Sequence, residues 1–127
     1  MKVKEVKLEK TKTVNEKDDV FKVAKKMGSS KSIIVLKNKR VLGIITMRDM
    51  VSRVLAKGKD PKKTFAKDIM TSPVFCAKEN DDIEEIAKVM LEKDYLTVPV
   101  VNKKGEYKGV LTLRQIILHR KKNKMKK

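Results

Sequence analysis

Apolar residues recur with helical spacing in two segments of the chain that match each other. The first covers residues 18–27, and its echo, 63 positions later, covers residues 81–90. In both, apolar side chains stand at positions i, i+3, i+4 and i+7, which places one apolar stripe along a helix. The aspartate pair that opens each segment is expected in the first helical turn, where negative charge favours the helix dipole. Gly28 is expected to cap the end of the first helix.

Each predicted helix is followed by two short apolar runs with the composition of strands. The runs cover residues 33–36 and 41–46 in one copy and residues 98–101 and 108–112 in the other, with turn residues between them. Further helical patterns begin at Met47 and Leu113. The chain is therefore predicted to be an α/β (α+β) protein of two pseudo-symmetric β-α-β-β-α repeats packed into one module. The expected division is residues 1–60, residues 61–119 and a basic C-terminal tail at residues 120–127.

The segment from Gly43 to Asp49 carries the most specific chemistry. A strand ends at Thr46, and an acid follows three positions later, at the start of a helix. This pattern is close to a capping box, in which the two residues close the helix end and bind nothing. The same geometry also suits a ligand, because a carboxylate in the first turn can accept both ribose hydroxyls and Arg48 can meet a phosphate. Both interpretations remain open at this point.

The ordered double occurrence of β-α-β-β-α repeats, each closing on a Gly-apolar-apolar-Thr motif with an acid or a similar residue three positions after the threonine, resembles a tandem pair of CBS (cystathionine-β-synthase-type) domains, also called a Bateman module. The likeness runs from about residue 8 to His119. It implies a sensor that binds an adenosine-containing ligand: AMP, ADP, ATP, S-adenosylmethionine or methylthioadenosine. The resemblance also implies a homodimer, because members of the family commonly pair their modules.

Carried over residue by residue, the resemblance implies one main ligand site and one weaker mirror site. Asp49 would hold the ribose, and Gln115 replaces the acid in the mirror site, which is therefore expected to be weaker or empty. The residues implied for the main site are Thr46, Arg48, Asp49, Val74, Phe75, Tyr95 and Thr97. Those implied for the mirror site are Thr11, Lys12, Ser30, Ser32, Thr112, Arg114 and Gln115.

The charge of the chain supports a second hypothesis, electrostatic binding of DNA or RNA. The net charge is +17, and residues 1–67 hold 20 basic and 7 acidic groups, a net of +13. Such a field attracts polyanions, although lysine-rich surfaces are also a habit of proteins from hyperthermophiles. The bases at the end of the chain are predicted to be uncompensated and to add to this surface: Arg120, Lys121, Lys122, Lys124, Lys126 and Lys127.

Other classes of protein find little support in the sequence. One cysteine, Cys76, and one histidine, His119, are too few for a metal site, and no nucleophile–base pair or phosphate-binding glycine loop is present. Neither a membrane-spanning stretch nor a signal peptide is predicted. The chain is therefore expected to be a cytoplasmic protein without catalytic activity, metal or required cofactor.

Overall fold

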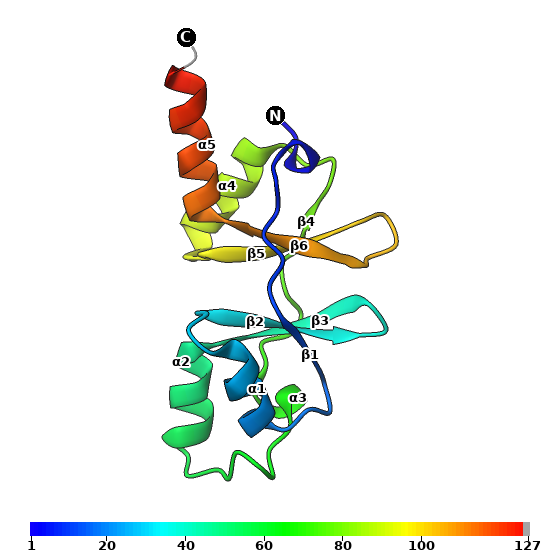
Figure 1. The fold of residues 1–127 in the computed structure, drawn as a ribbon, viewed down its shortest axis with the longest axis vertical. Coiled ribbons are helices and arrows are strands. Elements are labelled where there is room, and N and C mark those ends of the chain that lie inside the picture. The colour runs from blue at the N-terminus through cyan, green and yellow to red at the C-terminus, as the bar shows by residue number, and fades with distance from the viewer. Residues whose placement is uncertain (126–127) are drawn as a thin grey trace. The chain divides into compact units, whose positions relative to one another are not determined.

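The computed structural model describes residues 1–125, which fall into two compact units (Figure 1). Residues 11–74 form the first-repeat unit. Residues 1–10 join the chain from residue 75 onward to form the second-repeat unit. Each unit holds one three-stranded sheet with helices packed against it, so the predicted α/β class and the predicted repeat are confirmed.

The first-repeat unit has its strands in the order β1-β2-β3, with β1 parallel to β2 and β2 antiparallel to β3. Apolar residues of β2 and β3, such as Ile33 and Ile45, pack against the apolar stripe of α1. The helical spacing of Val20, Val23 and Met27 thus buries one face of the helix. The elements are β1 (Thr13–Asn15), α1 (Val20–Met27), β2 (Ser32–Lys37), β3 (Arg40–Thr46), α2 (Met47–Asp49), the π-helix η2 (Met50–Leu55) and α3 (Ala66–Ile69).

The second-repeat unit repeats this topology, with strand order β4-β5-β6 and a parallel followed by an antiparallel pairing. Ile86 and Met90 of its first long helix pack on Val98 and Leu111 of the sheet. The elements are the 3-10 helix η1 (Val3–Glu5), β4 (Ala77–Lys78), α4 (Ile83–Lys93), β5 (Thr97–Val101), β6 (Tyr107–Thr112) and α5 (Leu113–Met125).

The N-terminal segment belongs to the second-repeat unit, so the compact units differ from the predicted division at residue 60. The Val3 side chain is completely buried in the core formed by α4, β5 and β6. Its backbone N–H donates to the Asp81 carbonyl at 2.9 Å, and the Ile83 N–H donates to the Met1 carbonyl at 2.8 Å. Residues 61–74 pack instead with the first repeat. The buried Val3 side chain and these backbone hydrogen bonds therefore attach the N-terminal segment to the second repeat, although the first repeat follows it in the sequence.

One glycine in each repeat allows a chain segment to lie close against the last strand of its sheet. A Cβ on Gly43 would stand 2.9 Å from the Thr71 carbonyl oxygen, and one on Gly109 would stand 2.9 Å from the Glu9 carbonyl oxygen. Ile44 and Thr71 exchange backbone hydrogen bonds, as do Glu9 and Val110. Gly43 and Gly109 thus play the same part in the two repeats.

The helix ends refine the sequence predictions. Asp19 and Asp82 are the N-caps of α1 and α4, one position before the first turn in which they were expected. Gly28 ends α1 with a φ of 53°, as predicted. Residues 120–125, which the sequence interpretation set apart as the start of a basic tail, continue helix α5. Lys126 and Lys127 lie outside the described residues. Within residues 1–125, no helix is long and apolar enough to cross a bilayer.

The turn between β2 and β3 leads to a stability prediction. Asn38 and Lys39 form a two-residue turn with φ values of 51° and 70°, a backbone region that costs lysine more than glycine. We expect Lys39→Gly to raise the free energy of unfolding by about 0.5–1 kcal/mol in urea titrations. Lys39→Ala removes the same charge but keeps the Cβ, so it is the matched control and should give no comparable gain.

Candidate functional site

Thr46 and Asp49 form the capping box that their spacing predicts. Thr46 ends β3, and its backbone N–H donates to Asp49 Oδ2 at 2.8 Å. The Asp49 N–H donates in return to Thr46 Oγ1 at 3.2 Å. The backbone N–H of Met47 donates to the Lys31 carbonyl at 3.0 Å, just before β2. These contacts fix the carboxylate of Asp49 at the junction of strand and helix.

Asp49 stands out because it is a charged side chain that is only 8% exposed. Its second oxygen, Oδ1, lies 3.6 Å from Nε of Arg53, one turn further along the helix. Arg53 is itself held by the Ile69 and Met70 carbonyls, to which Nη1 donates at 2.9 and 3.1 Å. Since a carboxylate offers about four acceptor positions, Asp49 keeps acceptor capacity beyond the cap.

Arg53 is a residue of the site that the sequence interpretation missed. Its only sequence signal is the i,i+4 spacing from Asp49, which brings the two charges to the same side of a helix. Arg48, which was predicted near a phosphate, lies exposed beside Asp49. Its backbone carbonyl accepts a hydrogen bond from Ser52 Oγ at 2.8 Å. The guanidinium nearest the Asp49 carboxylate therefore belongs to Arg53.

The mirror position in the second-repeat unit has the same cap but a different side chain. Gln115 Oε1 accepts from the Thr112 N–H at 2.8 Å and from Thr112 Oγ1 at 3.2 Å. Its Nε2 donates to the Lys7 carbonyl at 2.8 Å, so the amide also ties down the N-terminal segment. A carboxylate has no donor for that second contact. Both ends of Gln115 are thus engaged, whereas Asp49 has one oxygen outside the cap.

The other residues implied for the main site divide between the units. In the second-repeat unit, the rings of Phe75 and Tyr95 stack with centroids 6.3 Å apart and an interplanar angle of 24°. Thr97 opens β5 and pairs with Thr112 of β6. Val74 is half-buried at the end of the first-repeat unit. The structure therefore brings together Phe75 with Tyr95, and Thr97 with the mirror cap.

Four of the remaining mirror-site residues lie in the first-repeat unit. Ser32 begins β2 opposite Thr46 of β3, and Ser30 occupies the turn after α1, where its N–H donates to the Met27 carbonyl at 2.8 Å. Thr11 and Lys12 precede β1. Arg114, the last member of the predicted set, is exposed at the start of α5 in the other unit. Their role in binding stays a prediction.

Arg120, which was predicted to be uncompensated, has an acidic partner in the structure. Its guanidinium forms an ion pair with Glu84 of α4, and its Nε lies 3.1 Å from Glu84 Oε1. The hydrogen bond from Arg120 lowers the pKa of Glu84, and the same contact raises the pKa of Arg120. Arg120 is therefore compensated, contrary to the prediction. Lys121 and Lys122 are exposed.

This ion pair can be tested by a pH titration. We expect the pKa of Glu84, followed by NMR of its side-chain carboxyl, to lie below the ordinary glutamate value. The Arg120→Gln substitution should move that pKa back toward the ordinary value, whereas Lys121→Gln, which removes a neighbouring charge, should leave it in place. An unshifted Glu84 in the unsubstituted protein would contradict the contact.

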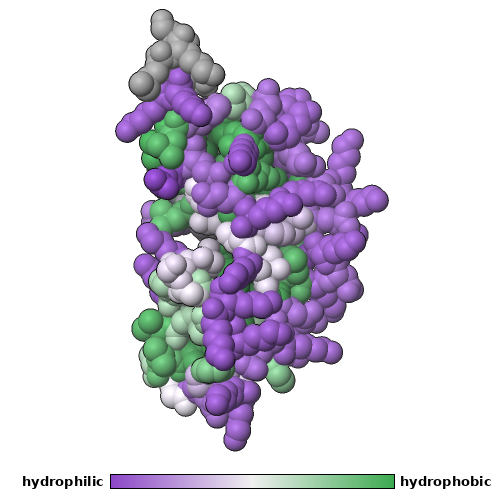
Figure 2. Space-filling model, in the orientation of Figure 1, coloured by the Kyte–Doolittle hydropathy of each residue, from purple (hydrophilic) through white to green (hydrophobic). Residues whose placement is uncertain are grey.

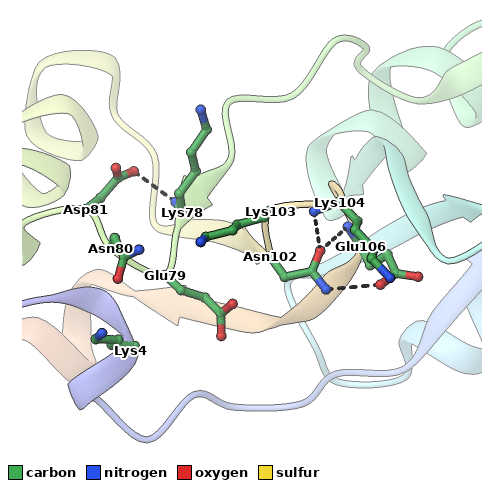
Figure 3. Close-up of a pocket in the computed structure, with 9 residues that line it drawn as sticks. All are labelled: Lys4, Lys78, Glu79, Asn80, Asp81, Asn102, Lys103, Lys104 and Glu106. Atoms are coloured by element: carbon green, nitrogen blue, oxygen red, sulfur yellow. Dashed lines mark hydrogen bonds between the residues drawn. The ribbon is translucent and has the colours of Figure 1, made fainter.

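A polar pocket of about 730 Å³ lies wholly within the second-repeat unit (Figure 3). Asn102 organises one wall, because its Oδ1 accepts from the Lys104 and Glu106 N–H groups at 2.9 and 3.0 Å. None of the predicted ligand residues lines this pocket, and the sequence interpretation missed it. Four lysines, three carboxylates and two asparagines line it: Lys4, Lys78, Glu79, Asn80, Asp81, Asn102, Lys103, Lys104 and Glu106.

Cys76 is half-buried, and burial raises the pKa of its thiol. Among residues 1–125, no three histidine, cysteine, aspartate or glutamate side chains come together as metal ligands. The Asp49 carboxylate can accept hydrogen bonds from hydroxyl groups, and the guanidinium of the exposed Arg48 can meet an anion.

The sheet order, the two matching caps and the repeated glycine contacts define a pair of equivalent α/β repeats. The CBS-domain profile matches residues 3–56 and 66–122. The chain belongs to the CBS-domain family and carries two CBS domains in tandem.

Individual relatives agree with this assignment. The chain is 34% identical to an uncharacterized protein of Methanopyrus kandleri over 90 residues, 71% of this chain and 46% of that protein. It is 35% identical to inosine-5′-monophosphate dehydrogenase of Methanocaldococcus jannaschii over 82 residues, which are 65% of this chain and 15% of the enzyme. The chain thus spans less than half of the length of either relative.

A solved structure shows the same fold. A CBS domain protein from Pyrobaculum aerophilum, complexed with AMP, superimposes with a TM-score of 0.79 at 24% identity. The match covers 91% of this chain and 89% of that protein. The likeness extends over nearly all of both chains, so both CBS domains share the architecture of that protein.

Proposed function

We propose that this protein is a regulatory module that binds an adenosine-containing ligand without transforming it. The observation that carries the proposal is Asp49, a nearly buried carboxylate whose Oδ1 is not consumed by the helix cap. Such an oxygen can accept hydrogen bonds from the cis hydroxyl groups of a ribose. The proposed ligands are AMP, ADP, ATP, S-adenosylmethionine and methylthioadenosine.

The other residues of the proposed site follow from the same ligand chemistry. Thr46 and the exposed Arg48 would lie near the phosphate or the equivalent polar group. The aromatic pair of Phe75 and Tyr95 offers a flat apolar surface for a base. Val74 and Thr97 complete the proposed set. Support also comes from the similar Pyrobaculum aerophilum protein, whose structure contains AMP.

The mirror position is proposed to be the weaker or empty site. Gln115 Oε1 accepts a hydrogen bond from the Thr112 N–H, and Gln115 Nε2 donates one to the Lys7 carbonyl. A ligand there would have to break the contact that holds the N-terminal segment. The proposal is therefore one high-affinity adenosyl site per chain, with Asp49 as its ribose acceptor.

A thermal-shift screen of adenosine derivatives tests this function. A ligand present at about 100 times its Kd adds roughly 2.7 kcal/mol to the free energy of unfolding, a shift of several degrees. We expect that shift to persist at high salt, with inorganic triphosphate as the control that carries charge but no adenosine. A shift produced equally by triphosphate and lost at high salt would contradict the proposal.

We also propose that the module acts as a homodimer. Met47, Val51 and Leu55 are exposed apolar residues spaced four apart along α2 and η2. In a π-helix this spacing is close to one turn, so the three side chains form one stripe. In Figure 2 apolar side chains gather over η2 at the lower left of the view. The same stripe on a second copy would cover it by twofold symmetry.

Nucleic-acid binding is the second candidate function. The first-repeat unit alone holds 16 basic and 6 acidic residues, a net charge of +10. Backbone phosphates supply most non-specific affinity and need only such lysines. Because Arg120 is paired with Glu84, most phosphate contacts are expected on the first-repeat unit. Lys121, Lys122 and Lys124 of α5 remain candidates for additional contacts.

A further inference from the structure

Two exposed phenylalanines stand at one junction of the first-repeat unit. Phe21, on α1, is 41% exposed, and Phe65, just before α3, is 43% exposed. The N–H of Phe21 donates to the Pro61 carbonyl at 3.1 Å, and Asp19 forms a β-bridge with Phe65. These bonds dock the segment of residues 61–66 against the start of α1. Both rings are therefore carried by a fixed backbone.

Lysine ammonium groups lie over both of these rings. Nζ of Lys25 is 4.7 Å and Nζ of Lys62 is 5.1 Å from the centroid of Phe21. Nζ of Lys67 is 5.8 Å from the centroid of Phe65. Within residues 1–125, none of these three lysines takes part in an ion pair. We call Phe21, Phe65, Lys25, Lys62 and Lys67 the aromatic-lysine surface.

The acidic side chains at this junction bind the backbone. Asp19 Oδ1 accepts from the Lys22 N–H at 2.8 Å, and Asp60 Oδ1 accepts from the Lys62 N–H at 3.0 Å. Asp68 Oδ2 accepts from the Phe65 N–H at 3.1 Å, and Asp18 Oδ2 accepts from the Asn15 N–H at 2.8 Å. Four carboxylates are thus used in caps and turns, while the lysines of the aromatic-lysine surface keep their charge for an external anion.

The pKa of Asp18 fits this division of roles. Burial alone would raise it, but hydrogen bonds from the Asn15 N–H and the Lys22 ammonium, with the nearby positive charge of Lys26, lower it. Asp18 therefore stays ionised and tied to its local partners. A negative group that is already satisfied by backbone and lysine competes little for the ammonium groups over the rings.

We propose that the aromatic-lysine surface binds single-stranded nucleic acid. Unpaired bases stack on the faces of exposed aromatic rings, and the flexible lysines whose ammonium groups lie over these faces can turn aside to meet the phosphates between those bases. Paired bases in a duplex are already stacked on one another and cannot use the rings, so the combination favours a single strand. The inference rests on the second candidate function, nucleic-acid binding, and specifies its surface and its strand form.

Fluorescence anisotropy with the full chain tests the proposal. The probes are a labelled single strand of about 16 nucleotides and a hairpin duplex with the same number of phosphates, at roughly 50 mM salt. We expect tighter binding of the single strand. Phe21→Ala combined with Phe65→Ala should weaken that binding at least about tenfold, because each stacked base contributes about five- to 150-fold in alanine substitutions.

Two further variants separate stacking from charge and from folding. Lys25→Gln combined with Lys62→Gln leaves the rings in place and should flatten the slope of log K against log salt by about 0.7 per lost contact. Leu91→Ala, which removes an exposed apolar side chain of α4, is the control and should bind as the unsubstituted protein does. If the double phenylalanine variant fails to fold, the lysine variant still gives the test.

Three outcomes would overturn the inference. Equal binding of duplex and single strand, unchanged by the phenylalanine substitutions, would mean attraction by charge alone and would leave the second candidate function standing. No binding of either probe at low salt would contradict both this inference and the second candidate function. A shift from dimer to monomer in the phenylalanine variant, seen by sedimentation, would assign the aromatic-lysine surface to a second copy of this chain.

Discussion

Val3→Asp is expected to lower the free energy of unfolding by about 3 kcal/mol or more. The Val3 side chain is fully buried among Ile83, Ile86 and Met90, where a carboxylate would have no counter-charge. Displacement of the N-terminal segment would also break its backbone hydrogen bonds, including the one from the Lys4 N–H to the Glu79 carbonyl at 2.9 Å. Chemical denaturation of the full chain measures the change.

Lys4→Asp is the matched control, because it introduces the same side chain one position later, at an exposed site. Surface changes of this kind shift the free energy of unfolding by about 0.5 kcal/mol or less. Similar small effects from both substitutions would show that the N-terminal segment is not packed on the second repeat. A large effect confined to Val3→Asp would establish it as part of that core.

The repeat and its elements were predictable because they rest on local periodicity. The apolar stripe of α1 and the short apolar run of β2 are visible in windows of about ten residues. The same is true of the Thr46–Asp49 cap, which depends on two residues three positions apart. Short-range patterns of this kind report on secondary structure with little need of the tertiary fold.

The features that escaped prediction depend on contacts between distant residues. Val3 is one apolar residue in a lysine-rich stretch, and nothing local indicates that it enters a core formed by residues 77–116. Arg120 meets Glu84 from 36 positions away. The single-turn helix α3 is too short to show a period, and its position depends on backbone bonds to residues near α1.

The candidate ligand site shows the same limit. The sequence predicts the cap at Asp49 and the equivalent position of Gln115, and the structure has a cap at both. The sequence alone does not indicate that Arg53 lies beside Asp49 Oδ1, or that Gln115 Nε2 donates a hydrogen bond to the Lys7 carbonyl. Since each of these contacts joins a cap to another element, only the folded chain reveals how the two positions differ.

Asp49→Asn is expected to weaken adenosyl-ligand binding tenfold to a hundredfold, which corresponds to roughly 1.5–3 kcal/mol. The amide keeps one carbonyl oxygen for the Thr46 N–H but loses the charged acceptor that the ribose hydroxyls would use. Gln115→Ala should have a much smaller effect, because its amide already serves the cap and the N-terminal segment.

Asp68→Asn is the matched control for the structural part of this substitution. Asp68 has the same place in a cap of the same unit, where Oδ2 accepts from the Phe65 N–H at 3.1 Å, and it is exposed. Asp68→Asn reports what the loss of a capping charge by itself does to the stability of the unit. A loss of affinity in Asp49→Asn that is absent from Asp68→Asn, at comparable stability of the two variants, would indicate a role of Asp49 in holding ligand.

The most direct test of the proposed function is isothermal titration calorimetry of AMP into the unsubstituted protein and these variants at high salt. One site per chain is expected, with affinity reduced about tenfold or more by Asp49→Asn and nearly unchanged by Asp68→Asn and Gln115→Ala. Equal affinities for all four proteins, or no heat of binding in any, would show that Thr46 and Asp49 form a helix cap and hold no ligand.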